Sequence, residues 1–323
     1  QALSGQALPA TWFGALRLAV AALFFAAYAA WTLPRGWRNG AALPKGSLLA
    51  AGVAMAVYNL AFFGGVRLTG VAVGTAVALG SGPVWAGVLQ SLLTRQVPPR
   101  GWWLGTALAV TGGVLMAGVG GAGTAVDVIG VLLCLSAGLS YAAYTLATKT
   151  LVPVAPPAVI TLSAFGVAAL LALPAAWVEA GVPTVRAADA AAVLYVGVVT
   201  AGVAYLLYSH ALHHVSAATG VTLALAEPVV AFLLALAVVG ERPPMAAYAG
   251  LLLVVAGVAV VWSWAARSRE RRDFVWARGS RKIRSCGCSS AGMCGGWRGP
   301  DRGCTAELRP GGADVVVFST DRL

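Results

Sequence analysis

Charged residues are scarce in this chain of 323 residues, since Asp, Glu, Lys and Arg make up 10% of it, against about 25% in an ordinary soluble domain. They are also unevenly spread, because residues 267–323 hold 12 of the 22 Lys and Arg and 6 of the 11 Asp and Glu. The rest of the chain has too few charges to cover a surface in water. With 59% apolar residues and a mean hydropathy of +0.82, this composition excludes a soluble globular fold and indicates a chain embedded in a bilayer.

Sequence signatures of catalysis are missing as well. The apolar spans contain no H-E-x-x-H metal motif, no G-x-S-x-G nucleophile motif and no pair of aspartates. Four of the five cysteines, Cys286, Cys288, Cys294 and Cys304, lie in the tail and lack the paired C-x-x-C spacing of a zinc site. We therefore predict that the protein is not an enzyme and has no metal site, no cofactor and no disulfide framework.

The net charge of +11 does not indicate nucleic-acid binding. The basic residues lie in short loops and in the tail, whereas a nucleic-acid interface gathers them on one folded face with aromatic or helical readers. The partners that we expect are the lipid bilayer and a small-molecule substrate, and nucleic acid is excluded. Proton coupling and a homodimer are left open.

Apolar stretches of about 20 residues, the length of a helix that crosses about 30 Å of hydrocarbon, recur along the chain. They are continuous and rich in Ala and Leu, unlike the alternating strands of a membrane barrel, so the predicted fold is an all-α polytopic membrane protein. The nine predicted spans are Ala10–Leu33, Ser47–Val66, Gly70–Leu93, Gly101–Gly121, Val126–Thr148, Pro157–Trp177, Ala190–Ser209, Val215–Val239 and Pro244–Trp264.

The loops between these spans differ in charge. Basic residues in short loops are retained in the cytoplasm, and one face has only such residues in its loops. These are Arg35, Arg38, Lys45, Arg95, Arg100 and Lys149, followed by the cluster Arg267, Arg269, Arg271 and Arg272. The other face carries Arg67, Arg186 and Arg242 against Asp127, Glu179, Asp189 and Glu241. We expect a multi-pass protein of the cell (inner or plasma) membrane with a cytoplasmic C-terminus.

The chain begins at Gln1 without a Met or the basic segment of a signal peptide. Nine spans and a cytoplasmic C-terminus would place residues 1–9 outside, and nothing in them would carry them across. We therefore expect that a first helix is missing from a ten-helix protein.

The sequence also contains an internal repeat. Sliding the chain on itself by 145 residues aligns Pro83 with Pro228, Gly105 with Gly250 and Gly112 with Gly257. The repeated unit is five helices, and because five is odd the second unit must be inverted in the membrane, an architecture common among carriers. The predicted divisions are 1–122 (four helices of the first repeat), 123–265 (the second repeat) and 266–323 (a basic, Gly- and Cys-containing disordered tail).

An ordered set of short motifs lies in both halves. The second half contains Val215-Ser216-Ala217-Ala218, Ala226-Glu227-Pro228-Val229-Val230, Gly240-Glu241-Arg242-Pro243 and Gly250-Leu251-Leu252-Leu253, and the first half contains Ala15-Leu16-Arg17, Leu68-Thr69-Gly70-Val71-Ala72, Gly82-Pro83-Val84 and Gly105-Thr106-Ala107-Leu108. Over about residues 10–265 the chain resembles EamA-type permeases of the drug/metabolite transporter superfamily. The resemblance implies ten helices with both ends cytoplasmic. The first half departs from the second, with Gly82 in place of Glu227 and Gln96 in place of Glu241.

Glu227 is the first candidate binding residue. It lies mid-span, where a carboxylate costs about 2.5–3.5 kcal/mol unless it is neutralised, paired or in water. The adjoining Pro228, like Pro83 in the first half, removes an amide hydrogen and frees a carbonyl one turn back, that of Ala224 or Leu79. Such interruptions in inverted halves point to a midplane site. Glu227 either binds a cationic or hydroxylated group or a proton, or forms a hydrogen bond that only holds the bundle together.

Further candidates are polar or aromatic residues at helical spacing. Tyr141, Tyr144, Thr145 and Thr148 share one helix face, and Tyr205, Tyr208 and Ser209 repeat the spacing, with Tyr58, Asn59, Ser81, Trp85 and Gln90 on first-half helices. They either line an amphipathic pocket for a small organic molecule or form hydrogen bonds between helices. Arg17 either counters Glu227 or an anionic substrate, or extends to the outer interface, which we favour.

Two groups of residues favour a structural role. The small residues Gly105, Ala109, Gly113 and Ala117 form a ridge that lets helices approach closely. His210, His213 and His214 lie at a helix end, and an interfacial polar cap is favoured over a pH sensor or metal site.

The repeat, the paired prolines and the interior polar residues favour a secondary transporter over an intramembrane enzyme. We expect it to export a small metabolite, amino-acid-like or drug-like molecule by alternating access. A channel, or a structural or receptor-like membrane protein, is the alternative.

Overall fold

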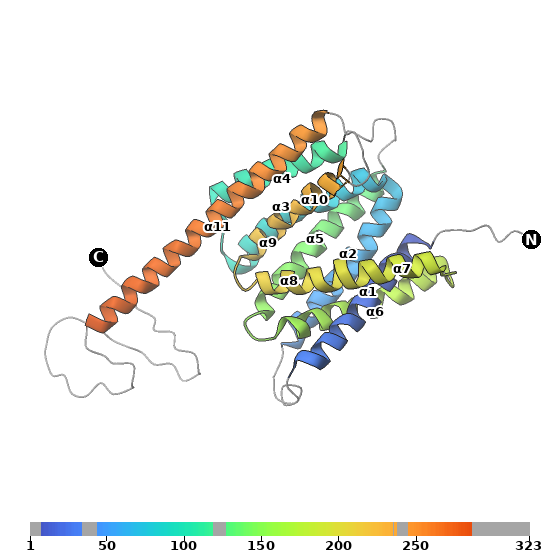
Figure 1. The fold of residues 1–323 in the computed structure, drawn as a ribbon, viewed down its shortest axis with the longest axis horizontal. Coiled ribbons are helices and arrows are strands. Elements are labelled where there is room, and N and C mark those ends of the chain that lie inside the picture. Colours follow the sequence, from blue (N-terminus) through green and yellow to red (C-terminus); the bar gives the residue numbers. More distant parts are fainter. Residues whose placement is uncertain (1–7, 34–43, 119–126, 235, 238–244, 286–323) are drawn as a thin grey trace, which may run out of the picture. The chain divides into compact units, whose positions relative to one another are not determined.

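The computed structural model describes residues 8–33, 44–118, 127–234, 236–237 and 245–285, and these are helical without a strand (Figure 1). The described residues divide into two units, one ending at Arg269 and the other beginning at Glu270. All nine predicted spans coincide with helical segments. These are α1 (Ala10–Thr32), α2 (Lys45–Thr69), α3 (Val71–Thr94), α4 (Arg100–Gly118), α5 (Val128–Leu151), α6 (Pro157–Ala180), the run α7 (Ala187–Tyr195), η2 (Val196–Val203) and α8 (Ala204–Ala211), the run α9 (Ala217–Leu223), η3 (Ala224–Ala226) and α10 (Glu227–Leu234), and α11 (Met245–Ser285).

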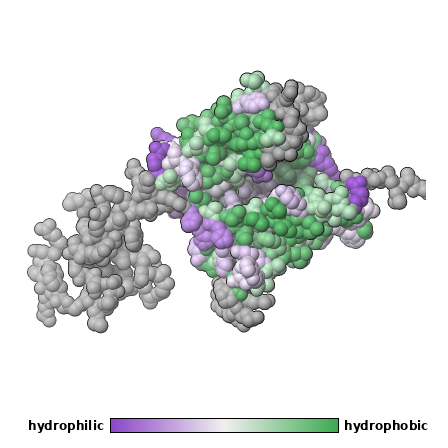
Figure 2. All heavy atoms as spheres, in the orientation of Figure 1, coloured by the Kyte–Doolittle hydropathy of each residue, from purple (hydrophilic) through white to green (hydrophobic). Residues whose placement is uncertain are grey.

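Seven of the described helical segments are long and apolar enough to cross a membrane by length and composition. The other two predicted spans correspond to α4 and to the interrupted run α9–η3–α10. Large apolar side chains lie on the outside, such as Leu170 (72% exposed) and Leu252 (70% exposed). Figure 2 shows apolar residues over broad areas of the visible face. Such a surface is stable against lipid and not in water, so the protein is a polytopic helical membrane protein.

The ends of the helices follow from local chemistry. The Asp127 carboxylate accepts hydrogen bonds from the amides of Ile129 (2.7 Å) and Gly130 (3.2 Å) at the start of α5, and it complements the positive end of the helix dipole. Helix α2 stops at Gly70, whose φ of +83° is a conformation that residues with a Cβ rarely adopt. The chain can therefore turn directly into α3.

The predicted start of the tail needs correction. The sequence places disorder from residue 266, whereas α11 is helical to Ser285. Residues 266–285 contain no proline and many Arg, a good helix former, so the loss of apolar residues after the last span does not end the helix. The four tail cysteines lie outside the described residues.

Helix α5 lies at the centre of the bundle. It packs along α2 and α3, and α6 packs along α1 and α2. The fully buried core between them includes Phe25, Leu18, Met55, Tyr144 and Phe165.

Helices α4 and α11 lie side by side and pack through glycine (Figure 1). A Cβ on Gly105 would meet the carbonyl of Gly257 at 2.8 Å, and one on Gly112 would meet the carbonyl of Gly250 at 2.5 Å. The two helices are antiparallel here, because the contact moves up α4 as it moves down α11. It is also reciprocal, because the offset of 145 residues equates Gly105 with Gly250 and Gly112 with Gly257, so the repeat exchanges the two contacts. Reciprocal contacts of this kind arise between equivalent segments related by a two-fold axis.

Neighbouring glycines on α4 test this packing. A Cβ at Gly112 would lie 2.5 Å from the Gly250 carbonyl and 2.6 Å from the Val254 amide, whereas a Cβ at Gly113 would meet nothing within 4 Å. We predict that Gly112→Ala destabilises the protein by about 1–3 kcal/mol, the cost of overpacking, while Gly113→Ala keeps the wild-type melting temperature in detergent. Equal melting temperatures for the two variants would contradict the close approach of α4 and α11.

Candidate functional site

Five tyrosines from three helices come together in the interior. Tyr58 is on α2, Tyr141 and Tyr144 are on α5, and Tyr205 and Tyr208 are on α8. The ring centroids of Tyr58 and Tyr141 are 5.5 Å apart, those of Tyr144 and Tyr205 are 5.9 Å apart, and those of Tyr141 and Tyr208 are 6.3 Å apart. This tyrosine cluster offers both ring faces and hydroxyl groups, which suits an amphipathic organic molecule.

A small cavity of about 50 Å³ lies against this cluster. Its lining includes Tyr58, Tyr141, Tyr205 and Glu227, four of the candidate residues. The other lining residues are Leu79, Val221, Ala224 and Leu225. The volume suffices for one or two water molecules, so a metabolite needs the helices to move apart.

The helix that carries Glu227 changes its winding at the cavity. Helix α9 tightens into the 3-10 turn Ala224–Ala226, and α10 begins at Glu227. The Ala224 carbonyl, expected to be free, accepts a hydrogen bond from the Glu227 amide across this turn. Pro83 instead lies inside the uninterrupted helix α3. The residues one turn before the two prolines, Leu79 and Ala224, both line the cavity.

The Glu227 side chain lines the cavity and is also exposed. It has no ion-pair partner within 4.0 Å in the described part of the chain, where the ion pairs are Arg67–Glu179 and Arg186–Asp189. The carboxyl group is therefore open to a ligand or a proton at this position.

Arg17 is directed inward from α1. Its Nη2 donates to Asn59 Oδ1 at 3.1 Å, and its guanidinium carbon lies 5.8 Å from the centroid of the Phe63 ring. Asn59 is 1% exposed, so the preferred account of Arg17, an extension to the outer interface, is wrong. The bonding partner on α2 holds the guanidinium inside, where it interacts electrostatically with Tyr58, Tyr205 and Glu227.

The remaining candidates lie around the cavity or apart from it. The Thr145 hydroxyl donates to the main-chain carbonyl of Tyr141 at 3.0 Å and lies 3.2 Å from the Tyr208 hydroxyl, so it positions the Tyr208 ring. Pro228 follows Glu227 in α10. Trp85 does not line the cavity and packs against an apolar cluster that includes Trp102, Val261 and the cavity-lining Val221.

Gln90 lies near the end of α3 and bonds to two main-chain groups. Its Oε1 accepts a hydrogen bond from the Ala218 amide at 3.0 Å, and its Nε2 donates to the Gln96 carbonyl at 3.4 Å. The side chain thus satisfies one of the free amides at the start of α9. It joins α3 to α9 and does not line the cavity.

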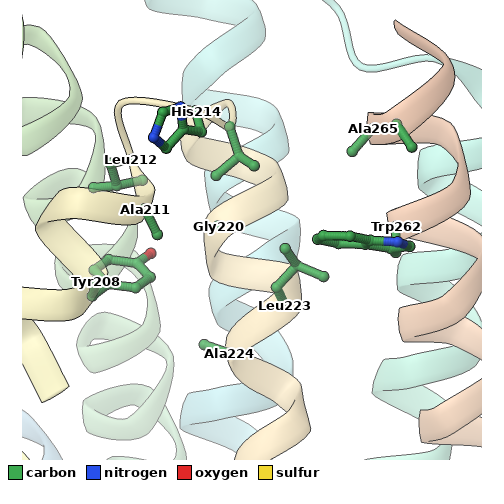
Figure 3. Close-up of a pocket in the computed structure, with 11 residues that line it drawn as sticks. Tyr208, Ala211, Leu212, His214, Gly220, Leu223, Ala224, Trp262 and Ala265 are labelled. Carbon is green, nitrogen blue, oxygen red and sulfur yellow. The ribbon is translucent and has the colours of Figure 1, made fainter. Parts of the chain in front are cut away.

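A second, larger cavity of about 550 Å³ lies between α8, α9 and α11 (Figure 3). Its lining is mostly apolar, and Trp262 of α11 projects toward Leu223 of α9. Tyr208 and His214 bring polar atoms into it, and Ala224 lines both this cavity and the small one. The two cavities therefore share a wall at the 3-10 turn.

The histidines lie at the end of α8, beside the larger cavity. Partial burial, together with His210, His214 and Lys149, lowers the pKa of His213 below its ordinary value, so its neutral form is favoured. His210 Nδ1 lies 2.9 Å from the Leu206 carbonyl. Within the described ranges, no three His, Cys, Asp or Glu residues come together as metal ligands.

The role of Gln90 can be tested by removing its amide. Gln90→Met leaves the buried Ala218 amide without its acceptor, and we expect a loss of stability of about 1–3 kcal/mol. Gln96→Met is the matched control, since only the main chain of Gln96 takes part and its side chain is exposed. Thermal unfolding in detergent measures the stability of both variants. A Gln90→Met protein as stable as the control would show that Gln90 does not stabilise the start of α9.

Comparisons with known proteins agree with this arrangement. A family model, that of EamA-like transporters, matches residues 128–263. The uncharacterized transporter YwfM of Bacillus subtilis (strain 168) is 36% identical over 213 residues, which cover 65% of this chain and 71% of that protein. A protein of known crystal structure shares the fold with a TM-score of 0.67 at 22% identity, covering 81% of this chain and 90% of the other.

Proposed function

Since this chain belongs to the EamA-like transporter family and is a membrane transporter, we propose that it is a secondary carrier that exports a small metabolite by alternating access. The proposed substrate is amino-acid-like or drug-like, with an apolar or aromatic part. The proposed binding residues are Glu227 and the tyrosine cluster. The observation that carries this proposal is the small cavity, where the Glu227 carboxylate and three tyrosine rings meet at an interrupted helix.

The cavity is built from both predicted repeats. Tyr58 and Leu79 come from the first, which we propose spans 1–122, and the other lining residues come from the second, 123–265. A site between two inverted repeats can be exposed to either side when the repeats exchange conformations. The reciprocal glycine contact between α4 and α11 supports this symmetry.

The larger cavity is the proposed access route. Its volume of about 550 Å³ lies within the range of ligand pockets, about 300–1,000 Å³, and Ala224 separates it from the small cavity. Tyr141 lines the small cavity, Tyr208 lines the larger one, and the two rings stack on each other. Substrate would pass this wall to reach Glu227, and the proposed coupling ion is a proton on the same carboxylate.

Glu227 is tested by an isosteric change. We expect Glu227→Gln to slow counterflow of transported metabolites in liposomes by about tenfold or more, because a charge-assisted contact contributes about 1.5–3 kcal/mol. Glu179→Gln is the control, since this exposed carboxylate pairs with Arg67. Counterflow that saturates with substrate favours a carrier, and conductance far above carrier turnover would favour a channel. Wild-type kinetics in Glu227→Gln would reject a direct role for this carboxylate.

The proposed orientation places the C-terminus in the cytoplasm of a cell membrane. Lys45 is the first residue of α2 and Arg186 precedes α7, so the chain between them crosses five times in this topology. In a protein whose five native cysteines are replaced by serine, we expect Lys45→Cys to react with an impermeant maleimide only after permeabilisation and Arg186→Cys to react in intact cells. Labelling of both from one side would overturn the inverted arrangement.

A further inference from the structure

The larger cavity lies where three helices approach one face of the membrane. Helix α8 ends at Ala211, α9 begins at Ala217, and the apolar span of α11 ends at Arg267. Trp262 lines the cavity and is 61% exposed. It comes five residues before Arg267, about 7.5 Å along the helix, and tryptophan is enriched at this level of a bilayer, between the headgroups and the acyl chains. The cavity therefore lies at the boundary of one leaflet.

The lining extends from this boundary toward the middle of the bilayer. Along α9 it reaches Ala224, seven residues beyond Ala217 and about 10 Å deeper, while half of the hydrocarbon is about 15 Å thick. The lining side chains are apolar except for Tyr208, His214 and Trp262. A buried water molecule needs several polar partners, and these three groups do not supply them along the whole cavity. The cavity therefore suits an apolar chain.

The cavity is open at the side of the bundle. Trp262 and Ala266 of α11 and Ala211 of α8 line it and are exposed. Figure 2 shows the visible face recessed between α11 and α8, and in Figure 3 Trp262 extends across part of the cavity toward Leu223. The side of a membrane helix bundle faces lipid, so an acyl chain can enter between these helices directly from the bilayer.

Positive charge borders the cavity. Lys149 Nζ donates to the carbonyl of Leu212, a lining residue, and Arg267 is exposed and directly follows the lining residue Ala266. The sequence of residues 267–273 has four Arg against one Glu and one Asp. Basic residues that directly follow a membrane span are typical of binding to anionic lipid headgroups. The apolar cavity and the cations beside it thus match the two parts of an anionic lipid.

We propose that the larger cavity binds an anionic phospholipid of the leaflet at these helix ends, which is the cytoplasmic leaflet in the proposed orientation. One acyl chain lies between Trp262 and Leu223, and the phosphate lies beside Lys149 and Arg267. The inference goes beyond the proposed transport, because it assigns a ligand other than the substrate to this cavity. An acyl chain can withdraw into the bilayer when a substrate enters, so the lipid site is compatible with the proposed access route.

Thermal unfolding of the purified protein in a non-ionic detergent measures lipid binding. Dioleoylphosphatidylglycerol, dioleoylphosphatidylcholine and inorganic phosphate are added separately at rising concentration. We expect phosphatidylglycerol to raise the melting temperature saturably, with an apparent affinity about 10- to 30-fold higher than that of phosphatidylcholine, because each of the two cations contributes about a fivefold preference. Inorganic phosphate alone should have no effect. Equal effects of the two lipids, or a shift produced by phosphate alone, would overturn the inference.

Charge variants test the position of the headgroup. Lys149→Gln and Arg267→Gln should each reduce the preference for phosphatidylglycerol by about fivefold, whereas Lys149→Arg keeps the charge and the preference. Lys45→Gln is the matched control, because Lys45 is an exposed cation at the start of α2 and does not line the cavity. Arg267→Gln gives the test at an exposed position if Lys149→Gln does not fold. A reduction of the same size in Lys45→Gln would indicate attraction to surface charge in general and reject the site.

Two alanines of α11 test the position of the acyl chain. Ala266 lines the cavity, whereas Ala256 is exposed and does not line it. Ala266→Trp fills the cavity, so we expect it to weaken the apparent affinity for phosphatidylglycerol by about tenfold or more, the equivalent of about two buried methylene groups. Ala256→Trp should bind the lipid as the wild type does. Wild-type affinity in Ala266→Trp would place the lipid elsewhere and overturn the inference.

The lipid site and the proposed carrier function can fail separately. The melting measurements use no transported substrate, so the absence of a lipid effect leaves the counterflow results as they are. If phosphatidylglycerol stabilises the wild type but not Ala266→Trp while no metabolite shows counterflow, the lipid site stands and the carrier function fails.

Discussion

The rest of the structure depends on the absence of hydrogen-bonding partners in the hydrocarbon of the bilayer. A polar group on a membrane helix must find its partner inside the protein, and for several groups here that partner lies on another helix. Arg17 binds Asn59 between α1 and α2, Gln90 binds the Ala218 amide between α3 and α9, and the hydroxyls of Thr106 and Thr222 lie 3.3 Å apart between α4 and α9. Because apolar contacts with lipid and with protein are similar in energy, these polar contacts and the glycine contacts determine which helices are neighbours.

The two predicted repeats differ in charge at one equivalent position. Gly82 holds the position in the first repeat that Glu227 holds in the second, and a Cβ on Gly82 would lie 3.5 Å from the Val221 side chain and 3.9 Å from the Tyr141 ring. Both of those residues line the small cavity. The repeat thus brings both equivalent positions to the same centre, where one carries a carboxylate and the other leaves room. The proposed binding site is therefore asymmetric between the two predicted repeats.

The sequence was sufficient for the helices and for four residues that line the small cavity, since both depend on strong, regular signals. A carboxylate and a proline in mid-span identify Glu227, and the spacing of Tyr141 from Tyr144 and of Tyr205 from Tyr208 places each pair on one helix face. Other features have no periodic signal. Leu79 and Val221 are apolar residues among many, the partner of Gln90 lies 128 residues away, and the direction of the Arg17 side chain depends on an acceptor in another helix. The helix over residues 266–285 was missed for a different reason. Its residues favour a helix, but they form no apolar face that would mark one in the sequence.

Symmetry has a consequence for how such a protein can move. Suppose that two inverted halves exchange conformations. A contact that the two-fold relation maps onto itself then has the same geometry before and after the exchange. The pairs Gly105–Gly257 and Gly112–Gly250 form such a contact, so close packing of α4 against α11 does not oppose the exchange, although main-chain atoms are in direct contact there. The environment of Glu227 is not preserved, since the equivalent position holds Gly82 and no charge. In the proposed alternating-access cycle, the two end states would then differ mainly in how the Glu227 carboxylate is solvated, and a bound cation or proton would shift the balance between them through that single group.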